Sequence, residues 1–331
     1  MRNSALFAVV AALLSGTTLG ACRATVAAPV DPRFAAAPAA ASASSTADVL
    51  CDYNVSVMNR SPSVNAVSNS RWTCTGTQRT VVANGIPDHA VVGTFPNANN
   101  PNAITAQTIT EAFALTPAMG TGPTQLGGPA GLVGMMLNGV KVDPGTGGTC
   151  DNNGNYVGFG HAGMWNLEAL NTSSFSFGTD ENNAHVQPGG LYHYHGMPEG
   201  LVTARGGSAT QMALVGWAAD GFAIYGRWGH SVATDASSPL RAMRGSYQLV
   251  TTANPNRPST TTFPLGTFQQ DFVYVAGSGD LDQCNGRVDV TPEFPAGIYH
   301  YYTTDTYPYI QRCVMGTVAG GGMMPPMGDG G

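Results

Sequence analysis

The stretch "PGGLYHYHGMPE" (188–199) and a later one, "PAGIYHYYTTDT" (295–306), are two versions of one short sequence, and they set the fold class expected for the chain. Both run from Pro and Gly through an aliphatic residue into Tyr-His-Tyr, a combination that is typical of the entry into a β-strand. When the two are aligned, His193 corresponds to His300 and His195 to Tyr302. The repeat indicates an internal structural duplication, or two strands that play equivalent roles.

The rest of the chain also predicts a mainly β fold. Of its 331 residues 43 are Gly and 22 are Pro, a turn-rich composition with few long helical patterns. Segments rich in Val, Thr and aromatic residues predict strands, and two other segments favour short helices. We therefore expect a single β-rich domain of short strands and few short helices, with strands at 54–59, 71–84 (a hairpin), 245–250 and 270–277 and helices at 108–115 and 163–171.

The N-terminus predicts export and a lipid anchor. Arg2 precedes "ALFAVVAALL" (5–14), an apolar run that is too short to span a bilayer as a mature helix and is typical of an export signal. The following "LGAC" (19–22) resembles the lipobox of bacterial lipoproteins, and the resemblance implies cleavage before Cys22 and acylation of that residue. In that family's sorting pattern, Arg rather than Asp at the next position favours the outer membrane. The alternative is a soluble secreted protein.

Composition divides the remainder of the chain. Behind a lipoprotein signal peptide at 1–21, residues 22–48 are rich in Ala, Pro and Ser and poor in large apolar residues, so we expect a flexible tether. The folded domain is expected to span 49–317 without an internal linker, and the Gly/Met/Pro-rich end, 318–331, to be disordered. The net charge of −6, with 10% charged residues, argues against nucleic acid as a partner.

The chain has six cysteines, and an exported chain uses cysteines mainly in disulfides. With the lipidated cysteine set aside, we expect Cys51 to pair with Cys74 and Cys284 with Cys313, since each pair is local and flanks a strand-like segment. The connectivity stays open at this stage. Cys150 is then left over, as a buried thiol, a metal ligand or a member of a different pairing.

The histidines of the two repeated segments predict a metal site. Alternate residues of a strand share a face, so His193 and His195 project together, about 6.6 Å apart along the strand. Two imidazoles at that spacing can bind one metal ion, and His300 is the expected third ligand if its strand lies beside or opposite the first. His185 is a fourth candidate, brought near by the turn at 188–190. The contrary interpretation is a set of core histidines that hydrogen-bond to each other and to the backbone.

Further polar residues are candidates for orienting a ligand or moving a proton. Tyr302 shares a strand face with His300 and can present its phenol to the metal or to a metal-bound water. Asp220 can orient a ligand histidine or form an Asp-Gly turn, and Asp305 is a weaker candidate. Imidazole and phenol ligands suit copper, zinc or iron, and the usual order of affinities favours copper over zinc. The segment "MMPPM" (323–327) adds thioethers that suit Cu(I). The remaining histidines are expected at the surface or in hydrogen bonds: His89, His161 and His230.

Several blocks of the sequence, in order, resemble the YHYH-domain proteins, a bacterial, exported family named for "YHYH" (192–195). The resemblance covers most of the mature chain and implies no particular activity. One departure is Lys141, which stands where the family pattern leads us to expect Pro and which bears on a turn. The blocks are "NGIPDHAVVGTFPNANNPN" (84–102), "LNGVKVDPG" (137–145), "DENNAHVQPGGLYHYHGMP" (180–198), "GWAADGFAIYG" (216–226) and "GDLDQCNGRVDVTPEFPAGIYHYYTTDTYPYIQRC" (279–313).

Three classes of function follow from these residues. The first is an envelope-anchored lipoprotein that binds or stores copper or zinc, with the membrane and the metal ion as its partners. The second is a metalloenzyme, a hydrolase or an oxidoreductase, whose three-histidine centre leaves a coordination position for water or oxygen. The third is a metal-free binding or surface domain stapled by disulfides. Metal content separates the third class from the first two.

Overall fold

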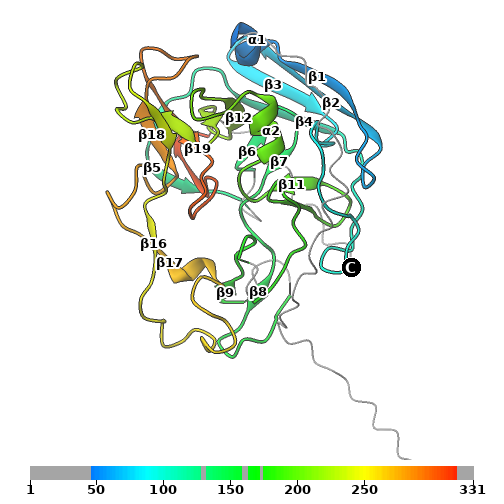
Figure 1. Cartoon of the computed structure of the whole chain (residues 1–331), viewed down its shortest axis with the longest axis vertical. Coiled ribbons are helices and arrows are strands. Elements are labelled where there is room, and N and C mark those ends of the chain that lie inside the picture. The colour runs from blue at the N-terminus through cyan, green and yellow to red at the C-terminus, as the bar shows by residue number, and fades with distance from the viewer. Residues whose placement is uncertain (1–45, 128–131, 159–162, 172–173, 319–331) are drawn as a thin grey trace, which may run out of the picture.

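The computed structural model of the chain describes residues 46–127, 132–158, 163–171 and 174–318, which are drawn in colour in Figure 1. The predicted signal peptide, Cys22, most of the tether and nearly all of the C-terminal tail lie outside these residues, so they stay predictions. Within the described ranges, no helix is long and apolar enough to cross a membrane.

The N-terminal part of the domain is an antiparallel sheet of four strands in the order β1-β2-β3-β4. The predicted strand at 54–59 is β1, and the predicted hairpin at 71–84 is formed by β2 and β3. The disulfide between Cys51 and Cys74, as predicted, ties the preceding helix α1 to β2. The bounds are Thr46–Cys51 for α1, Asn54–Asn59 for β1, Ala66–Thr75 for β2, Gln78–Ala83 for β3 and Ile109–Ala114 for β4.

The prediction of a helix at 108–115 is wrong, because this segment forms β4. Its side chains at Ile109, Glu111 and Phe113 are buried and those between them are more exposed, which is the two-residue period of a strand. β4 pairs with β3 along its whole length. The long-range ladder thus overrides the local helix preference of Glu, Ala and Leu.

A mixed sheet of eight strands forms the centre of the domain, in the order β10-β11-β7-β6-β12-β13-β19-β18. The two Tyr-His-Tyr segments are β11 and β19, so the predicted strands at both copies are confirmed. The bounds are Gly134–Met136 for β6, Lys141–Val142 for β7, Ala184–Val186 for β10, Tyr192–Tyr194 for β11, Leu214–Ala218 for β12, Ala223–Tyr225 for β13, Gly286–Asp289 for β18 and Ile298–Tyr302 for β19.

The eight-stranded sheet is an internal duplication. From the centre outward, the strands of one half are β6, β7, β11 and β10, and those of the other half are β12, β13, β19 and β18. In both halves the third strand along the chain lies at the outer edge, and the fourth lies between it and the second. In both halves the successive pairings are antiparallel, parallel and antiparallel. The halves join through the antiparallel pair β6 and β12, which relates them by an approximate two-fold axis.

The register at the centre of the sheet agrees with this two-fold relation. Met135 of β6 faces Trp217 of β12, and the axis passes through this pair. Gly134 pairs with Val142 of β7, and Gly216 pairs with Ile224 of β13. These registers make Gly134 and Gly216 equivalent positions. Two residue pairs flank this axis, Gly216 with Met136 and Ala218 with Gly134. Rotation about the axis places one of these pairs on the other.

The turn that leads into the outer strand of each half is also duplicated. Asp180 accepts backbone hydrogen bonds from two of the next four residues at 2.9 and 3.2 Å, and Asp282 does the same at 2.9 and 3.0 Å. Asn183 and Asn285, three residues after each aspartate, both have the left-handed backbone that asparagine tolerates, with φ of 55° and 64°. The two halves therefore share local turn chemistry as well as strand order.

The four-stranded sheet packs on one face of the duplicated sheet. Trp72 and Phe113 of the smaller sheet share one apolar cluster with Met135 and Trp217 of the larger. The turns between β6 and β7 and between β12 and β13 come so close that a Cβ added at Gly139 or Gly221 would lie 2.3 Å from Ala83 Cβ or Ala114 O. The opposite face carries a second apolar cluster, which includes Met136, Tyr192, Tyr194, Ile224, Tyr301 and Val314.

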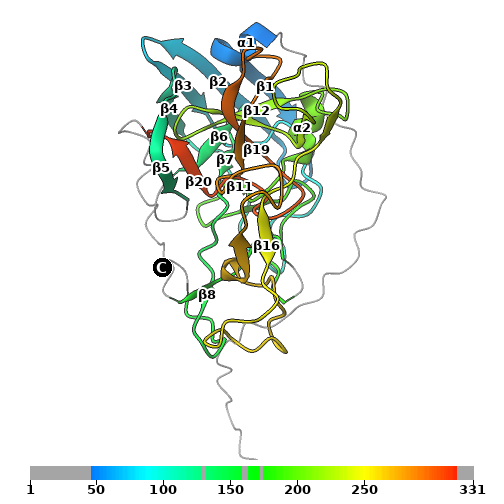
Figure 2. The same cartoon turned by 90° about the vertical axis from the view of Figure 1, so that its left-hand side faces the viewer.

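Short two-stranded ladders complete the fold. In Figures 1 and 2, β8, β9, β16 and β17 lie together at the end of the molecule farthest from β1 and β2. The predicted strands at 245–250 and 270–277 are represented by β16 and β17. The remaining bounds are Met119–Gln125 for β5, Thr149–Cys150 for β8, Trp165–Asn166 for β9, Trp228–His230 for β14, Leu240–Ala242 for β15, Tyr247–Leu249 for β16, Phe272–Tyr274 for β17, Cys313–Gly316 for β20, Glu199–Ala204 for α2 and Gln269–Asp271 for the 3₁₀ helix η3.

The prediction of a helix at 163–171 is also wrong. Trp165 pairs with Cys150 in the β8–β9 ladder, and Leu167 forms a bridge with Phe268, so the backbone is extended there. Cys150 is buried in the apolar cluster of this end and lies outside both disulfides.

The second predicted disulfide, between Cys284 and Cys313, joins the turn before β18 to β20.

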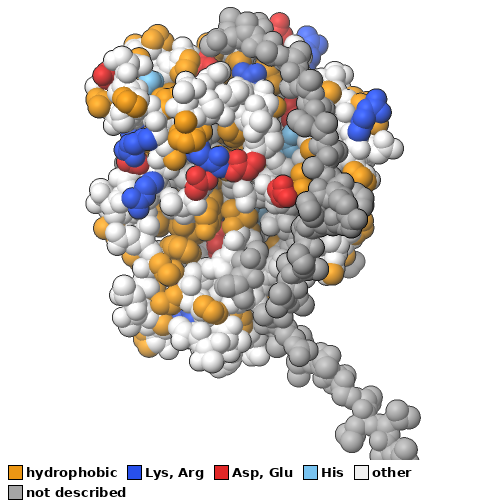
Figure 3. Space-filling model, viewed as in Figure 1, with side chains coloured by type: hydrophobic (Ala, Val, Ile, Leu, Met, Phe, Trp, Pro, Cys, Tyr) orange, Lys and Arg blue, Asp and Glu red, His pale blue; other side chains and the backbone are white. Residues whose placement is uncertain are grey.

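Over the surface, on the face drawn in Figure 3, the few acidic and basic side chains are interspersed among uncharged ones.

A buried tyrosine hydroxyl in each half is bonded to the aspartate of its turn, at 2.6 Å for Tyr192 to Asp180 and 2.8 Å for Tyr299 to Asp282. Because a buried carboxylate oxygen would lose its donor, we expect Tyr192→Phe to lower the free energy of unfolding by about 1–3 kcal/mol. Tyr299→Phe should lower it by less, since Asp282 is less buried than Asp180. Urea denaturation measures both, with Tyr274→Phe at an exposed tyrosine as the control. Equal stability of all three variants would show that neither hydrogen bond stabilises the fold.

Candidate metal centre

Three histidines from two neighbouring strands meet on one face of the N-terminal half of the sheet. β10 and β11 form an antiparallel pair in which His185 lies directly opposite His193. His195 follows β11 and, two residues on, projects from the same face as His193. Tyr192 and Tyr194 point to the opposite face, into the other apolar cluster.

The three side chains are close enough to share one ion. One possible ligand atom from each of His185, His193 and His195 lies within 4.8 Å of the others. The ring centroids are 4.6 to 4.7 Å apart, and Nε2 of His195 is 3.0 Å from Nε2 of His185. Three imidazoles bound at 2.0–2.1 Å in a tetrahedral site have nitrogens roughly 3.3 Å apart. Small side-chain rotations are enough to reach that geometry.

Backbone carbonyls fix the orientation of two of the rings. Nδ1 of His185 is 2.9 Å from the carbonyl oxygen of Phe177, and Nδ1 of His193 is 3.2 Å from that of Leu191. Since a carbonyl can only accept, both Nδ1 atoms carry the proton and both Nε2 atoms present a lone pair. His195 also has a backbone partner, since a hydrogen bond to the Pro144 backbone acts to raise its pKa.

Burial keeps the cluster uncharged. His193 and His195 are 3% and 1% exposed, and His185 is half-buried. Loss of solvent, followed by the influence of His185, lowers the pKa of His193 to about 3, and the same causes hold the pKa of His195 well below its usual range. The pKa of His185 is lowered too, mainly by burial. At neutral pH all three imidazoles are thus in the neutral form that binds metals.

A buried ion pair lies beside the cluster. Lys141 Nζ is 2.7 Å from Asp143 Oδ2, and the negative charge of Asp143 acts to raise the pKa of both His185 and His193. Lys141 pairs with His193 in the β7–β11 ladder, so the prediction that this position bears on a turn is wrong. Sequence reasoning missed Asp143, although the alternation in "KVD" (141–143) places it on the same strand face as Lys141.

The structure does not bring His300 to this cluster, which corrects the prediction of a third ligand from the second repeat. His300 lies on β19, and four strands separate β19 from β11, each about 4.8 Å wide. Tyr302 lies with His300, where its hydroxyl donates to Asp289 at 2.6 Å.

The other two predicted supporting residues also lie away from the three histidines. Asp220 accepts hydrogen bonds from the Tyr301 hydroxyl and the Gly316 backbone and forms the Asp-Gly turn between β12 and β13. Asp305 pairs with Arg227.

The second half of the sheet contains the counterpart of the cluster with different side chains. The strand registers make Arg287 equivalent to His185, His300 to His193 and Tyr302 to His195. Arg287 and Tyr302 both bond to Asp289. Burial lowers the pKa of His300 to about 4, and its Nε2 is buried with no hydrogen-bond partner among the described residues. In this half of the sheet, the charged guanidinium of Arg287 occupies the position that His185 has in the other half.

Of the remaining histidines, His89 is buried and bonds through its two ring nitrogens to the Tyr194 hydroxyl and the Ala90 carbonyl. His230 bonds to the Ser238 carbonyl. Both fit the expectation of hydrogen-bonded histidines, and His161 lies outside the described residues.

A comparison with protein-family models matches residues 110–316, more than half of the chain, to the family described as YHYH protein. The chain belongs to the YHYH protein family. The match spans both halves of the duplicated sheet, so the three histidines and their counterpart both lie in the YHYH domain. Neither a search of curated proteins nor a search of solved structures finds a match.

Proposed function

We propose that this YHYH protein binds one zinc or copper ion through His185, His193 and His195. The observation that carries the proposal is the convergence of three buried, neutral imidazoles, two of which have their Nδ1 protons committed to backbone carbonyls. Metal-binding histidines commonly donate the second ring nitrogen to a carbonyl in this way. Nε2 of His195 and Nε2 of His185, 3.0 Å apart, form a hydrogen bond that an ion bound to both rings would replace.

The ligand set favours zinc or copper. Imidazole suits both ions, whereas magnesium and calcium prefer oxygen ligands. Three histidines leave a fourth position for water, as in open zinc sites. Asp143 places a carboxylate near the cluster, and Lys141 holds it in an ion pair that balances its charge.

We favour binding or storage over catalysis. The phenol that was expected to move protons, Tyr302, belongs to the other half of the sheet and is bonded to Asp289. His195 and His193 are almost fully buried, so a bound ion is accessible only from the side of the half-buried His185. This arrangement retains an ion better than it admits a substrate.

The proposed location is the cell envelope. The chain forms two disulfides, Cys51–Cys74 and Cys284–Cys313, which persist mainly in oxidising compartments. Together with the lipobox-like "LGAC" (19–22), they support an exported, lipid-anchored protein whose metal site lies outside the cytoplasm.

Substitution of the three ligands tests the proposal. His193→Ala or His195→Ala should weaken zinc binding by more than about 100-fold, because loss of an outer-shell partner alone typically costs about 10–100-fold. Chelator competition followed by metal quantification reads this out.

The matched control is His300→Ala, at the equivalent position of the other half, which should retain wild-type affinity. If the variants at His193 and His195 hold zinc as tightly as His300→Ala does, the histidines are core hydrogen-bonding residues and the proposal is wrong.

The duplication also allows a gain of function. Arg287→His combined with Tyr302→His recreates three histidines around His300, and we expect the ion content to rise from about one to about two per chain. Each single substitution supplies only two ligands and should leave the content near one. If the double variant is as stable as the wild type and still holds only one ion, the second half of the sheet cannot position three histidines as the first half does.

A further inference from the structure

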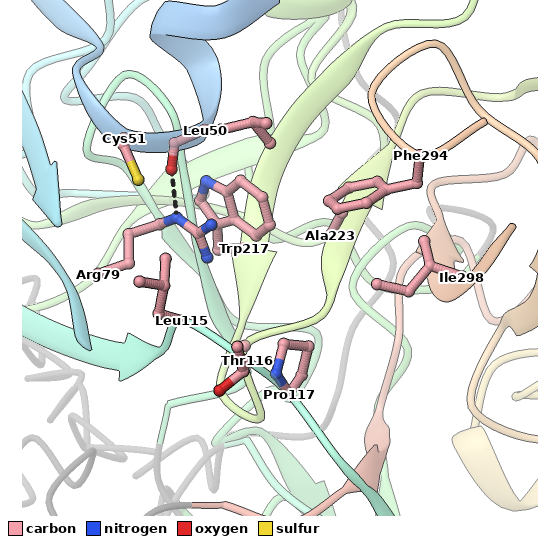
Figure 4. A pocket seen from close by; sticks show the side chains of 11 residues that line it. Leu50, Cys51, Arg79, Leu115, Thr116, Pro117, Trp217, Ala223, Phe294 and Ile298 are labelled. Carbon is pink, nitrogen blue, oxygen red and sulfur yellow. Dashed lines mark hydrogen bonds between the residues drawn. The ribbon is translucent and has the colours of Figure 1, made fainter. Parts of the chain in front are cut away.

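A cavity of about 400 Å³ lies between the four-stranded sheet and the centre of the eight-stranded sheet. Figure 4 shows Arg79 and Trp217 stacked on one side of the cavity and Phe294 and Ile298 on the other. Leu115 also lines the cavity. The cavity is distant in topology from the histidine cluster, because β12 and β13 line it and β10 and β11 do not. Its volume is within the range of small-molecule sites.

Arg79 brings a positive charge to the wall of this cavity. The side chain is 3% exposed, its Nε donates to the Leu50 carbonyl at 2.9 Å, and its Nη1 is buried without a hydrogen-bond partner. Among the carboxylates whose side chains the structure describes, none forms an ion pair with Arg79. Glu111, on the neighbouring strand, has Lys141 as its cationic neighbour. Burial lowers the pKa of Arg79 to about 10, which reflects the cost of holding the charge there.

Two other buried arginines of the same protein show how such charges are normally matched. Arg257 pairs with Asp271 at 2.8 Å, and Arg312 pairs with Glu168 at 2.7 Å. A buried charge without a partner is strongly unfavourable, so arginines inside proteins are expected to have one. Arg79 departs from that rule, and it does so at the wall of a cavity.

Trp217 adds a second donor that has no partner. Its ring lies 3.3 Å from the Arg79 guanidinium carbon, and its Nε1 is buried without a hydrogen bond in the described structure. The ring shields the guanidinium by a cation–π contact but supplies no negative charge. The rest of the lining is mainly apolar, from side chains such as Leu50, Phe294 and Ile298.

We propose that this cavity binds a small monocarboxylate with an apolar tail, whose carboxylate pairs with Arg79 and whose tail fills the apolar remainder. A guanidinium matches a carboxylate in shape and can donate two parallel hydrogen bonds to it. A single arginine among apolar groups does not suit a phosphate, which carries more charge and needs more donors. The proposal does not depend on the metal site.

Octanoate is the probe for this site. Isothermal titration calorimetry of the full-length protein should show saturable octanoate binding, and Arg79→Met should weaken it by at least about tenfold, since a charge-assisted bond is lost. Arg79→Met keeps most of the packing of the side chain and removes a buried unpaired charge, so the variant should unfold at or above the wild-type temperature. Arg71→Met, at an exposed arginine of the same sheet, is the matched control and should bind as wild type does.

Two further comparisons keep the test decisive. Ala223→Leu retains Arg79 but fills part of the cavity, and it should also weaken octanoate binding. Octanol, with the same tail and no charge, should bind at least about tenfold more weakly than octanoate. The proposal is overturned if wild-type protein does not bind octanoate, if octanol binds as tightly, or if folded Arg79→Met binds as wild type does.

Discussion

The hydrogen bond from a buried tyrosine to the aspartate of the preceding turn fixes the register on which the rest of the sheet depends. Tyr192 donates to Asp180 in one half and Tyr299 to Asp282 in the other. Because side chains alternate along a strand, holding Tyr192 on one face places His193 on the other, opposite His185. A slip of one residue would exchange the faces and leave both a phenol and a carboxylate without partners. The histidine cluster is therefore a consequence of the tyrosine register.

Much of the fold follows from local sequence. Strand β1 and the β2–β3 hairpin are apparent from β-branched and aromatic residues between turns, and the repeated Tyr-His-Tyr segments indicate both strands of the duplication. The disulfides could be predicted because each joins cysteines close in sequence on either side of a strand. Of the candidate ligands, His185, His193 and His195 could be found because one turn separates their strands.

What sequence reasoning missed depends on contacts between distant segments. The repeat of Tyr-His-Tyr suggested that His300 joins His193, but a two-fold axis places equivalent residues in separate halves of the sheet. The segment 108–115 has helix-forming residues, and only its pairing with β3 makes it a strand. Arg79 gave no signal, since its lack of a counter-charge appears only when the two sheets are packed together.

X-ray absorption spectroscopy of the zinc-loaded domain tests the central claim most directly, because it reports the ligands of the ion itself. The account predicts about one tightly held zinc per chain, with three imidazole nitrogens at about 2.0–2.1 Å and one further oxygen ligand. A domain that retains no zinc after dialysis, or a first shell with sulfur or with fewer than two imidazoles, would contradict it.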